Sequence, residues 1–277
     1  FGLRDEIRQE AKVAVQEAQA AGIRVVMITG DAKNTARAIA KEMGIIQGDN
    51  PVVTTSTELG EMSDAQVRDM LPNLCVVSRA LPTDKSRLVK AAKERNWVVG
   101  MTGDGVNDAP AVKNADVGFA MGSGTEMTKE SSDIVILDDN FSSLTRAVLY
   151  GRTLLKSIRK FLIFQLSVNV AAILVAFFGP FFGIGLPLTM TQMLWINLVM
   201  DTLAAIAFAG EAALSRYMKE PPIPKNAPLI TPDMWSAIFT NGIAMAIMSL
   251  FFLTSDGLSS FFACDESRCG LPTDPGY

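Results

Sequence analysis

The string TGDGVND at 102–108 carries the residues of this sequence best suited to chemistry. Asp104 and Asp108 are carboxylates four positions apart, and carboxylate oxygens are ligands that Mg²⁺ prefers while it keeps several waters and bridges to a phosphate. Gly103 and Gly105 allow the backbone to come close to such a ligand. Because the string follows a continuous apolar run, the pattern favours a magnesium and phosphate site at a strand end over an ordinary turn with capping aspartates.

Two further strings are weaker when each is taken alone. Thr29, Gly30 and Asp31 form a second TGD, and a threonine hydroxyl with free N–H groups at a helix start can hold a phosphoryl oxygen. A lone TGD is more often an ordinary helix N-cap. Lys85, in the string PTDK, can neutralise phosphate charge, although a lone lysine is more often solvated. The order of hydroxyl, lysine and paired carboxylates favours one phosphate-handling site.

These residues need a scaffold, and the first 140 residues alternate the signals of strands and helices. Continuous apolar runs predict strands at 23–29, 74–78, 97–102, 117–120 and 134–137. Helices are expected at 5–21, from Asp31 as the N-cap to Gly44, and at 84–95. This alternation implies a parallel sheet with helices on both faces. Ligands bind at the carboxyl ends of such strands, where both TGD strings fall.

The second half of the chain has the composition of membrane helices. A helical pattern begins at Phe141 and runs without a break into the first of three apolar stretches, each long enough to span a bilayer. The three spans are expected at about 161–179, 188–210 and 234–253. Lysine and arginine cluster before the first span and between the second and third. The positive-inside rule therefore places 1–160 and 211–233 in the cytoplasm, and the tail outside.

These signals predict a soluble domain at 1–150, a membrane segment at 151–253 and an extracytoplasmic loop at 254–277. The net charge of −4 gives no sign of nucleic-acid binding, and the lack of histidine excludes an imidazole base from this chain. The three cysteines lack metal-site spacing. Cys264 and Cys269 lie in the expected outside loop, where a disulfide is allowed but not required. Since the chain begins at Phe1, we expect an internal fragment of a longer protein.

Three strings carry a family resemblance: ITGD (28–31), PTDKSRLV (82–89) and MTGDGVNDAPAVKNADVGFAMG (101–122). They resemble the phosphorylation domain of P-type ATPases, which has the haloacid-dehalogenase-like α/β fold with a Rossmann-like parallel sheet. With the three spans, the resemblance covers nearly the whole chain. It implies that Thr29 holds the phosphoryl group, Lys85 neutralises it and Asp104 binds Mg²⁺. It further implies that Asn107 and Asp108 organise the Mg²⁺ site and that Gly30, Asp31 and Gly103 shape the pocket.

The family's nucleophile is an aspartate in a DKTGT string, which this sequence lacks. An aspartyl-phosphate is therefore not expected on the isolated chain, which should be inactive alone. The ATP-binding domain, the actuator domain and the earlier spans would precede Phe1. The missing N-terminal part of the same pump is thus an expected partner, together with ATP and the lipid bilayer.

Polar residues within the spans suggest which ion is carried. Asn169 lies midway along the first span, and Asn197 and Asp201 lie one turn apart midway along the second. An aspartate at the bilayer centre costs roughly 2.5–3.5 kcal/mol, so it normally faces a partner, a cavity or an ion path. Such oxygen ligands suit Ca²⁺, and a helix–helix hydrogen bond is the alternative. Gln165 and Gln192 could be such hydrogen-bonding residues and are not assigned to the site.

The strings QLSVNVAA (165–172) and QMLWINLVMDTLAAIA (192–207) resemble the fifth and sixth spans of calcium pumps, closest to the plasma-membrane type and its bacterial relatives. The reticulum type binds two ions, with a glutamate where Ala172 stands and a threonine where Met200 stands. The resemblance thus implies a multi-pass plasma-membrane pump that uses ATP to export one Ca²⁺ per cycle. A pump for Mn²⁺ or Na⁺, a membrane-anchored phosphatase of the same fold, and a non-catalytic fragment are the alternatives.

Overall fold

The computed structural model describes residues 7–48, 50–184 and 188–255. The chain divides into two compact units. Unit 1 comprises Phe1–Thr153 and Ala213–Ala227, and unit 2 comprises Leu154–Ala212 and Pro228–Tyr277. The expected start of the first helix at Asp5 and the tail cysteines Cys264 and Cys269 lie outside the described residues.

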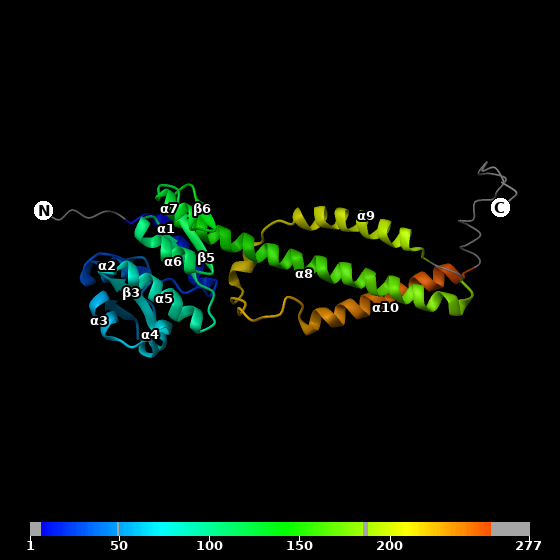
Figure 1. Cartoon of the computed structure of the whole chain (residues 1–277), viewed down its shortest axis with the longest axis horizontal. Helices are drawn as coiled ribbons and strands as arrows, with labels where there is room; N and C mark the ends of the chain where they lie inside the picture. The colour runs from blue at the N-terminus through cyan, green and yellow to red at the C-terminus, as the bar shows by residue number, and fades with distance from the viewer. Residues whose placement is uncertain (1–6, 49, 185–187, 256–277) are drawn as a thin grey trace. The chain divides into compact units, whose positions relative to one another are not determined.

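Unit 1 alternates short strands with helices (Figure 1). The strands are β1 (Met27–Ile28), β2 (Val52–Thr55), β3 (Leu74–Ser78), β4 (Gly100–Gly103), β5 (Val117–Met121) and β6 (Ile134–Ile136). The α-helices are α1 (Gln9–Ala20), α2 (Lys33–Glu42), α3 (Ser56–Glu61), α4 (Asp64–Met70), α5 (Pro82–Glu94), α6 (Ala109–Asn114) and α7 (Glu126–Glu130). Three 3₁₀ turns complete the unit: η1 (Leu71–Asn73), η2 (Val106–Asp108) and η4 (Ser215–Lys219).

The strands of unit 1 form two parallel sheets, in the orders β1-β3-β2 and β4-β5-β6. This confirms the parallel α/β fold that the alternating pattern predicts. The strands predicted at 23–29 and 97–102 are shorter, since only Met27 and Ile28 pair in β1 and pairing in β4 covers Gly100–Gly103. Ile28 packs against one core cluster and Met27 against another, so both faces of β1 are covered. Among the described residues β1 is an edge strand that pairs only with β3, and its residues are half-buried.

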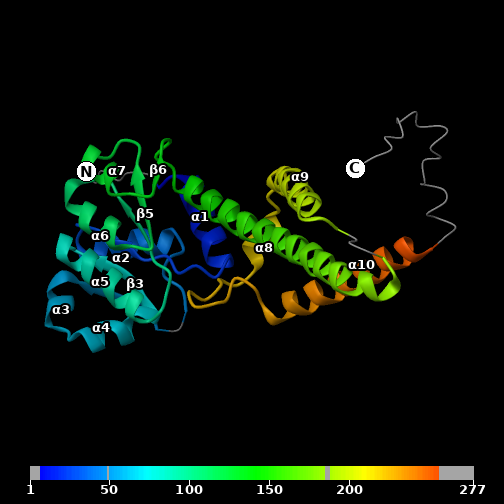
Figure 2. The same ribbon diagram turned by 45° about the vertical axis from the view of Figure 1, so that its right-hand side comes forward.

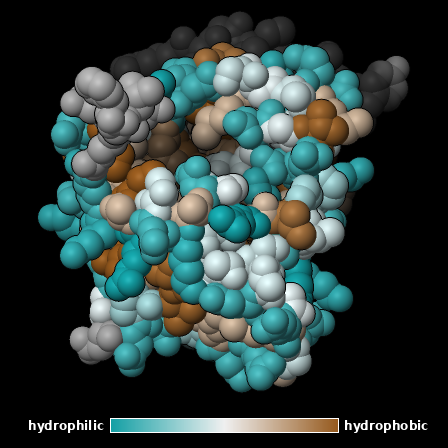
Figure 3. All heavy atoms as spheres, turned by 90° about the vertical axis from the view of Figure 1, so that its left-hand side faces the viewer, coloured by the Kyte–Doolittle hydropathy of each residue, from teal (hydrophilic) through white to brown (hydrophobic). Residues whose placement is uncertain are grey.

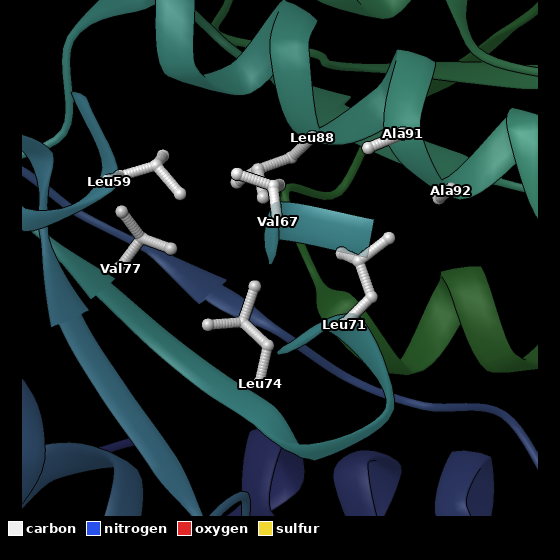
Figure 4. Close-up of a cluster of buried hydrophobic side chains, with 8 residues drawn as sticks. All are labelled: Leu59, Val67, Leu71, Leu74, Val77, Leu88, Ala91 and Ala92. Carbon is white, nitrogen blue, oxygen red and sulfur yellow. The ribbon is translucent and has the colours of Figure 1, made fainter. Parts of the chain in front are cut away.

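One apolar cluster of unit 1 lies between the first sheet and its helices, and another holds Met101 of β4 against α5 and α6. All five residues of β3 are buried, and Leu74 and Val77 face Leu88 on α5 in the cluster drawn in Figure 4. On α5, Leu88, Ala91 and Ala92 lie three and four positions apart, so they share one helix face. Pro82 in the first turn suits the helix start because its missing N–H needs no partner there. The sheet and α5 therefore hold Lys85, on the first turns of this helix, in a rigid frame.

The segment 51–73, which the sequence analysis left unassigned, folds as β2, α3, α4 and η1. Its helices begin with reciprocal caps, in which Thr55 pairs with Glu58 and Ser63 pairs with Gln66. Each is a Ser or Thr followed three residues later by Glu or Gln, which is a readable start signal. Hydrophilic residues predominate on the face of unit 1 in Figure 3, with hydrophobic patches between them.

Unit 2 contains most of α8 (Phe141–Phe178), the 3₁₀ turn η3 (Gly179–Phe182), α9 (Met190–Ala209) and α10 (Pro232–Thr254). Within the described residues, three helices are long and apolar enough to cross a membrane, at Phe141–Phe182, Met190–Ala209 and Pro232–Thr254. α8 is unbroken from Phe141, as the sequence pattern predicts. Helices α8 and α10 pack closely where Gly242 meets Val170, and their ribbons cross in Figure 2.

Candidate functional site

The TGDGVND string forms the end of β4 and the turn that follows it. Gly103 is the last residue of β4, and a Cβ at this position would lie 2.6 Å from Asp108 Cβ and 2.9 Å from Val112 Cγ2. Only glycine therefore fits there. The Asp108 N–H donates to the Gly105 carbonyl over 2.9 Å, which closes the 3₁₀ turn η2 and returns Asp108 toward the strand end. Asp108, the last residue of this turn, is buried.

The Asp108 carboxylate is bound by protein groups on both oxygens. Lys85 Nζ lies 2.5 Å from Asp108 Oδ1, and the Asp104 N–H donates to Asp108 Oδ2 over 3.4 Å. The side chains of Lys85 and Asp108 are 20% and 9% exposed, so the ion pair is largely shielded from water. Helix α5 thus brings the lysine of the second string to the third string, as the resemblance implies for one site.

Asp104 presents a carboxylate that is free to bind a ligand. Asp104 and Asn107 are both exposed, and no hydrogen bond or ion pair to the Asp104 carboxylate is present within 7–48, 50–184 and 188–255. No group of three or more His, Cys, Asp or Glu side chains that could hold a metal occurs in this described part. Mg²⁺ usually needs only one or two carboxylates, with waters and substrate phosphates completing the octahedron. The residues therefore fit Mg²⁺ bound by Asp104, with Asp108 behind it holding the Asp104 backbone.

The first TGD string does not cap a helix in the predicted way. Helix α2 begins after Ala32, which is its N-cap, and not after Asp31. The reason is local: the Thr29 hydroxyl donates to Asp31 Oδ2 over 2.9 Å, and the Asp31 N–H donates back to Thr29 Oγ1. The Asp31 side chain is therefore turned toward Thr29. Nothing lies within 4 Å of a Cβ built on Gly30, so crowding does not require glycine there.

The three strings are connected by a series of contacts, and no single contact among the described residues joins all three. The Ala80 N–H donates to the Thr29 carbonyl over 3.0 Å, just before the chain enters α5, which carries Lys85. Lys85 in turn contacts Asp108. No hydrogen bond or ion pair joins the Thr29 side chain to Lys85, Asp104 or Asp108 in the described residues, because β1 and β4 belong to separate sheets.

In unit 2, α9 has one half-buried face that carries two of its polar residues. Asn197 and Asp201 lie on this face, which has the helical spacing of three and four. Its other members are Met193, Met200, Ala204 and Phe208. Asp201 Oδ1 is buried and has no hydrogen-bond partner in the described part of the chain. Buried polar atoms are nearly always satisfied, so this oxygen is open to a ligand or to a partner outside the described residues. Asn169, on α8, is also half-buried.

The two glutamines of the spans behave differently. Gln165 Oε1 is buried and, like Asp201 Oδ1, has no partner among the described residues. Gln192 caps the start of α9, where its Oε1 accepts the Thr189 N–H over 3.0 Å. The Gln192 side chain therefore returns through Oε1 to its own helix terminus, and a hydrogen bond from its amide N–H groups to another helix stays a prediction.

Several contacts had no readable signal in the sequence. Within unit 2, Glu211 accepts hydrogen bonds from Lys160 and Ser157. Within unit 1, Arg152 donates to the carbonyls of Ala21, Tyr217 and Glu220, which ties the start of α8 to the segment 213–227. These contacts join residues more than 50 positions apart, so no local pattern reports them.

Lys225 extends the same attachment within unit 1. Its Nζ lies 2.6 Å from Asp116 Oδ1, and Asp116 Oδ2 accepts the Val99 N–H just before β4. Burial raises the pKa of the Asp116 carboxyl, but hydrogen bonds from Lys225 and Val99 and the charges of Lys93 and Lys225 outweigh burial and lower the pKa overall. In the folded protein, Asp116 therefore keeps its negative charge at pH values below the ordinary pKa of an aspartate.

Two family models match the chain in separate parts. The model for haloacid dehalogenase-like hydrolases matches residues 1–116, and the model for the C-terminus of cation transporting ATPases matches residues 185–261. A solved catalytic domain of the CPx-ATPase CopB-B aligns over 53% of this chain and 48% of its own, with 26% identity. Its TM-score of 0.40 is too low to add to the assignment. With the parallel-sheet domain and the three apolar helices, the family-model matches identify the chain as part of a P-type ATPase.

The relatives narrow this class. The chain is 48% identical over 239 residues to plasma membrane-type calcium-transporting ATPase 7 of Oryza sativa subsp. japonica, a match that covers 84% of this chain and 23% of the relative. It is 43% identical over 282 residues to plasma membrane calcium-transporting ATPase 4 of Bos taurus, a match that covers 96% of this chain and 23% of that relative. The chain belongs to the P-type ATPases, is a membrane protein, and has plasma membrane-type calcium-transporting ATPases as its homologues. It spans about a quarter of their length.

Proposed function

We propose that this chain is the phosphate-handling and ion-binding part of an ATP-driven Ca²⁺ pump. In the complete pump, Asp104 binds Mg²⁺, Lys85 neutralises the phosphoryl group and the Thr29 hydroxyl holds one of its oxygens. Mg²⁺ supplies charge neutralisation at the transferred phosphoryl group. The free Asp104 carboxylate beside the Lys85–Asp108 ion pair supports these roles. Asn107 and Asp108 organise the Mg²⁺ site, and Gly30, Asp31 and Gly103 shape the pocket.

The nucleophile comes from the missing N-terminal part of the pump. β1 and β4, which carry the two TGD strings, are each the outer strand of a separate parallel sheet. A strand that pairs with both would complete one continuous sheet. Its carboxyl end would then lie between Thr29 and Asp104, at the edge where ligands bind. The isolated chain, which lacks the DKTGT aspartate, should therefore form no phosphoenzyme from ATP.

One observation carries the choice of Ca²⁺: an unpartnered carboxylate oxygen of Asp201 is buried on the polar face of a membrane-spanning helix. Asn197 lies one turn away on that face, and Asn169 offers a further amide oxygen from α8. Carbonyl groups and an upstream carboxylate would complete the six to eight oxygens that Ca²⁺ takes. Since the side chains of Ala172 and Met200 offer no oxygen where the two-ion pumps have a side-chain oxygen, a single Ca²⁺ is carried per cycle.

The pump is a multi-pass protein of the plasma membrane. Residues 1–160 and 211–233 lie in the cytoplasm, and the chain after α10 begins outside. The positive-inside distribution of lysine and arginine supports this orientation. Labelling of Cys75 in intact cells by an impermeant thiol reagent, in preference to Cys264 and Cys269 after reduction, would contradict it.

The experiment is made on the full-length pump that contains this chain. Asp201→Asn keeps the side-chain shape and removes the charge, so Ca²⁺-dependent phosphorylation by ATP should fall at least tenfold, which is about 1.4 kcal/mol or more in binding. Phosphorylation by inorganic phosphate should persist because unit 1 is unchanged. Thr202→Val is the matched control, since Thr202 is exposed and donates only to the Leu198 carbonyl of its own helix.

The same pump preparation gives the ion and the stoichiometry. One Ca²⁺ bound per phosphorylatable enzyme is expected. A value near two would contradict the single site. Phosphorylation that depends on Mn²⁺ or Na⁺ and not on Ca²⁺ would favour a pump for that ion, and wild-type activity in Asp201→Asn would remove this residue from the ion path.

A further inference from the structure

Thr128, on the short helix α7, is a buried threonine that the proposed chemistry does not use. The residue is 0% exposed, although Met127 beside it on α7 is exposed. Its hydroxyl donates to the Gly105 carbonyl over 2.8 Å, across 23 residues of sequence. A buried hydroxyl directed at the turn that carries Asp104 needs an explanation, since a valine of the same shape would fill the space without a polar atom.

The direction of the hydrogen bond between Thr125 and Thr128 follows from the bond that Thr128 donates to Gly105. Thr128 Oγ1 and Thr125 Oγ1 lie 2.8 Å apart. A threonine hydroxyl has one hydrogen, and that of Thr128 is used on Gly105. Thr125 is therefore the donor and Thr128 the acceptor, so the two hydroxyls form a directed chain that ends on the Gly105 carbonyl.

Thr125 also holds the residue before Gly105. Its N–H donates to the Asp104 carbonyl over 2.9 Å. At the neighbouring Gly124, a Cβ would lie 3.1 Å from the Asp104 carbonyl oxygen and 3.3 Å from Asp104 Cα, so the backbone of this loop packs directly against Asp104. Two successive carbonyls, of Asp104 and Gly105, are thus held by one pair of threonines.

The Asp104 backbone is held on its other side as well, because its N–H donates to Asp108. The carboxylate itself is left without a partner among the described residues. We infer that Thr128, acting through Gly105 and Thr125, is a positioning residue that orients the Asp104 carboxylate for Mg²⁺. The inference rests on the proposed role of Asp104. Groups that orient a metal ligand without touching the metal typically change metal affinity by tenfold to a hundredfold.

The test uses the full 277-residue chain in lipid nanodiscs, with Mn²⁺ as the probe and Mg²⁺ as its competitor. Mn²⁺ affinity is measured by electron paramagnetic resonance. Thr128→Val should weaken Mn²⁺ binding by about tenfold, and Thr128→Ser, which keeps the hydroxyl, should restore most of it. Thr54→Val is the matched control: Thr54 is also a buried threonine of unit 1, but it bonds to Thr55 and Glu58, far from this turn in the chain.

The outcomes separate the inference from the proposed function. Binding that survives in Asp104→Asn would overturn the Mg²⁺ role of Asp104, and the inference with it. Mn²⁺ binding that is lost in Asp104→Asn but unchanged in Thr128→Val would overturn the inference alone. The inference would also be overturned if Thr54→Val weakened Mn²⁺ binding as much as Thr128→Val does. If Thr128→Val does not fold, Thr125→Val takes its place, because it keeps the N–H bond to Asp104 and loses only the hydroxyl. Unchanged affinity in that variant would also overturn the inference.

Discussion

Lys85 Nζ lies 2.5 Å from Asp108 Oδ1, and this ion pair joins α5 to the turn that follows β4. Lys85→Met should destabilise unit 1 by about 1–3 kcal/mol, because the buried Asp108 carboxylate would lose its charged partner. Hydrogen exchange of the amides in β4 and α6, followed by mass spectrometry, measures the effect. The control is Lys33→Met, which breaks the more exposed pair with Glu58 and should have a smaller effect because water screens that pair. Equal protection in both variants would contradict a structural role for the Lys85 pair.

Gly103→Ala should destabilise the same turn by about 1–3 kcal/mol, since its Cβ would overlap Asp108 and Val112. Gly105→Ala, two positions on, is the matched control. Nothing lies within 4 Å of a Cβ there, and its φ of −105° suits any residue, so its effect should stay within about 0.5 kcal/mol. Thermal unfolding followed by circular dichroism compares the two. A larger loss in Gly105→Ala would show that the turn differs from this description.

The Asp116–Lys225 pair should make stability depend on pH in the acid range. The pKa of the Asp116 carboxyl is lower in the folded than in the unfolded chain, so the stability that it contributes is present above about pH 4 and is lost as pH falls through the lowered pKa. Lys225→Met removes one cause of the lowering. This variant should be less stable near neutral pH, and its difference from the wild type should shrink as the pH falls below about 4.

Urea denaturation at a series of pH values checks this expectation. In the Asp116→Asn background the effect of Lys225→Met should become independent of pH, because the titrating partner is gone. A difference between wild type and Lys225→Met that stays constant from neutral to acid pH would contradict the linkage.

Gly242→Ala should disturb the packing of α8 against α10. A Cβ at Gly242 would lie 2.7 Å from Val170 Cγ1 and 3.0 Å from the Ser167 carbonyl oxygen. Small residues allow membrane helices to approach closely, so the added methyl group should cost about 1–3 kcal/mol. Gly151→Ala, also within a helix but with nothing within 4 Å, should instead stabilise by up to about 1 kcal/mol. Thermal unfolding in detergent distinguishes the two, and equal shifts would argue against this helix contact.

The sequence alone determined the class of fold and most of the residues that we propose to act. Apolar runs such as 74–78 and the three uncharged stretches are local signals, and they report burial in a sheet or in a membrane without knowledge of any partner. The strings 29–31 and 102–108 mark strand ends, and ligands bind at the carboxyl ends of parallel strands. Asn197 and Asp201 could be placed on one face because helical periodicity is also local.

Only the tertiary structure decided how these residues are held. Lys85 meets Asp108 across 23 residues, Thr128 reaches Gly105 across 23, and Arg152 reaches Tyr217 across 65. Each contact depends on which elements pack together, and the sequence near each residue does not indicate a partner so far along the chain. The N-cap at Ala32 and the edge position of β1 could not be read from the sequence either, because each had alternatives of equal standing. Asp31 could bond to the helix or to Thr29, and a strand looks alike in sequence whether one or both of its edges are paired.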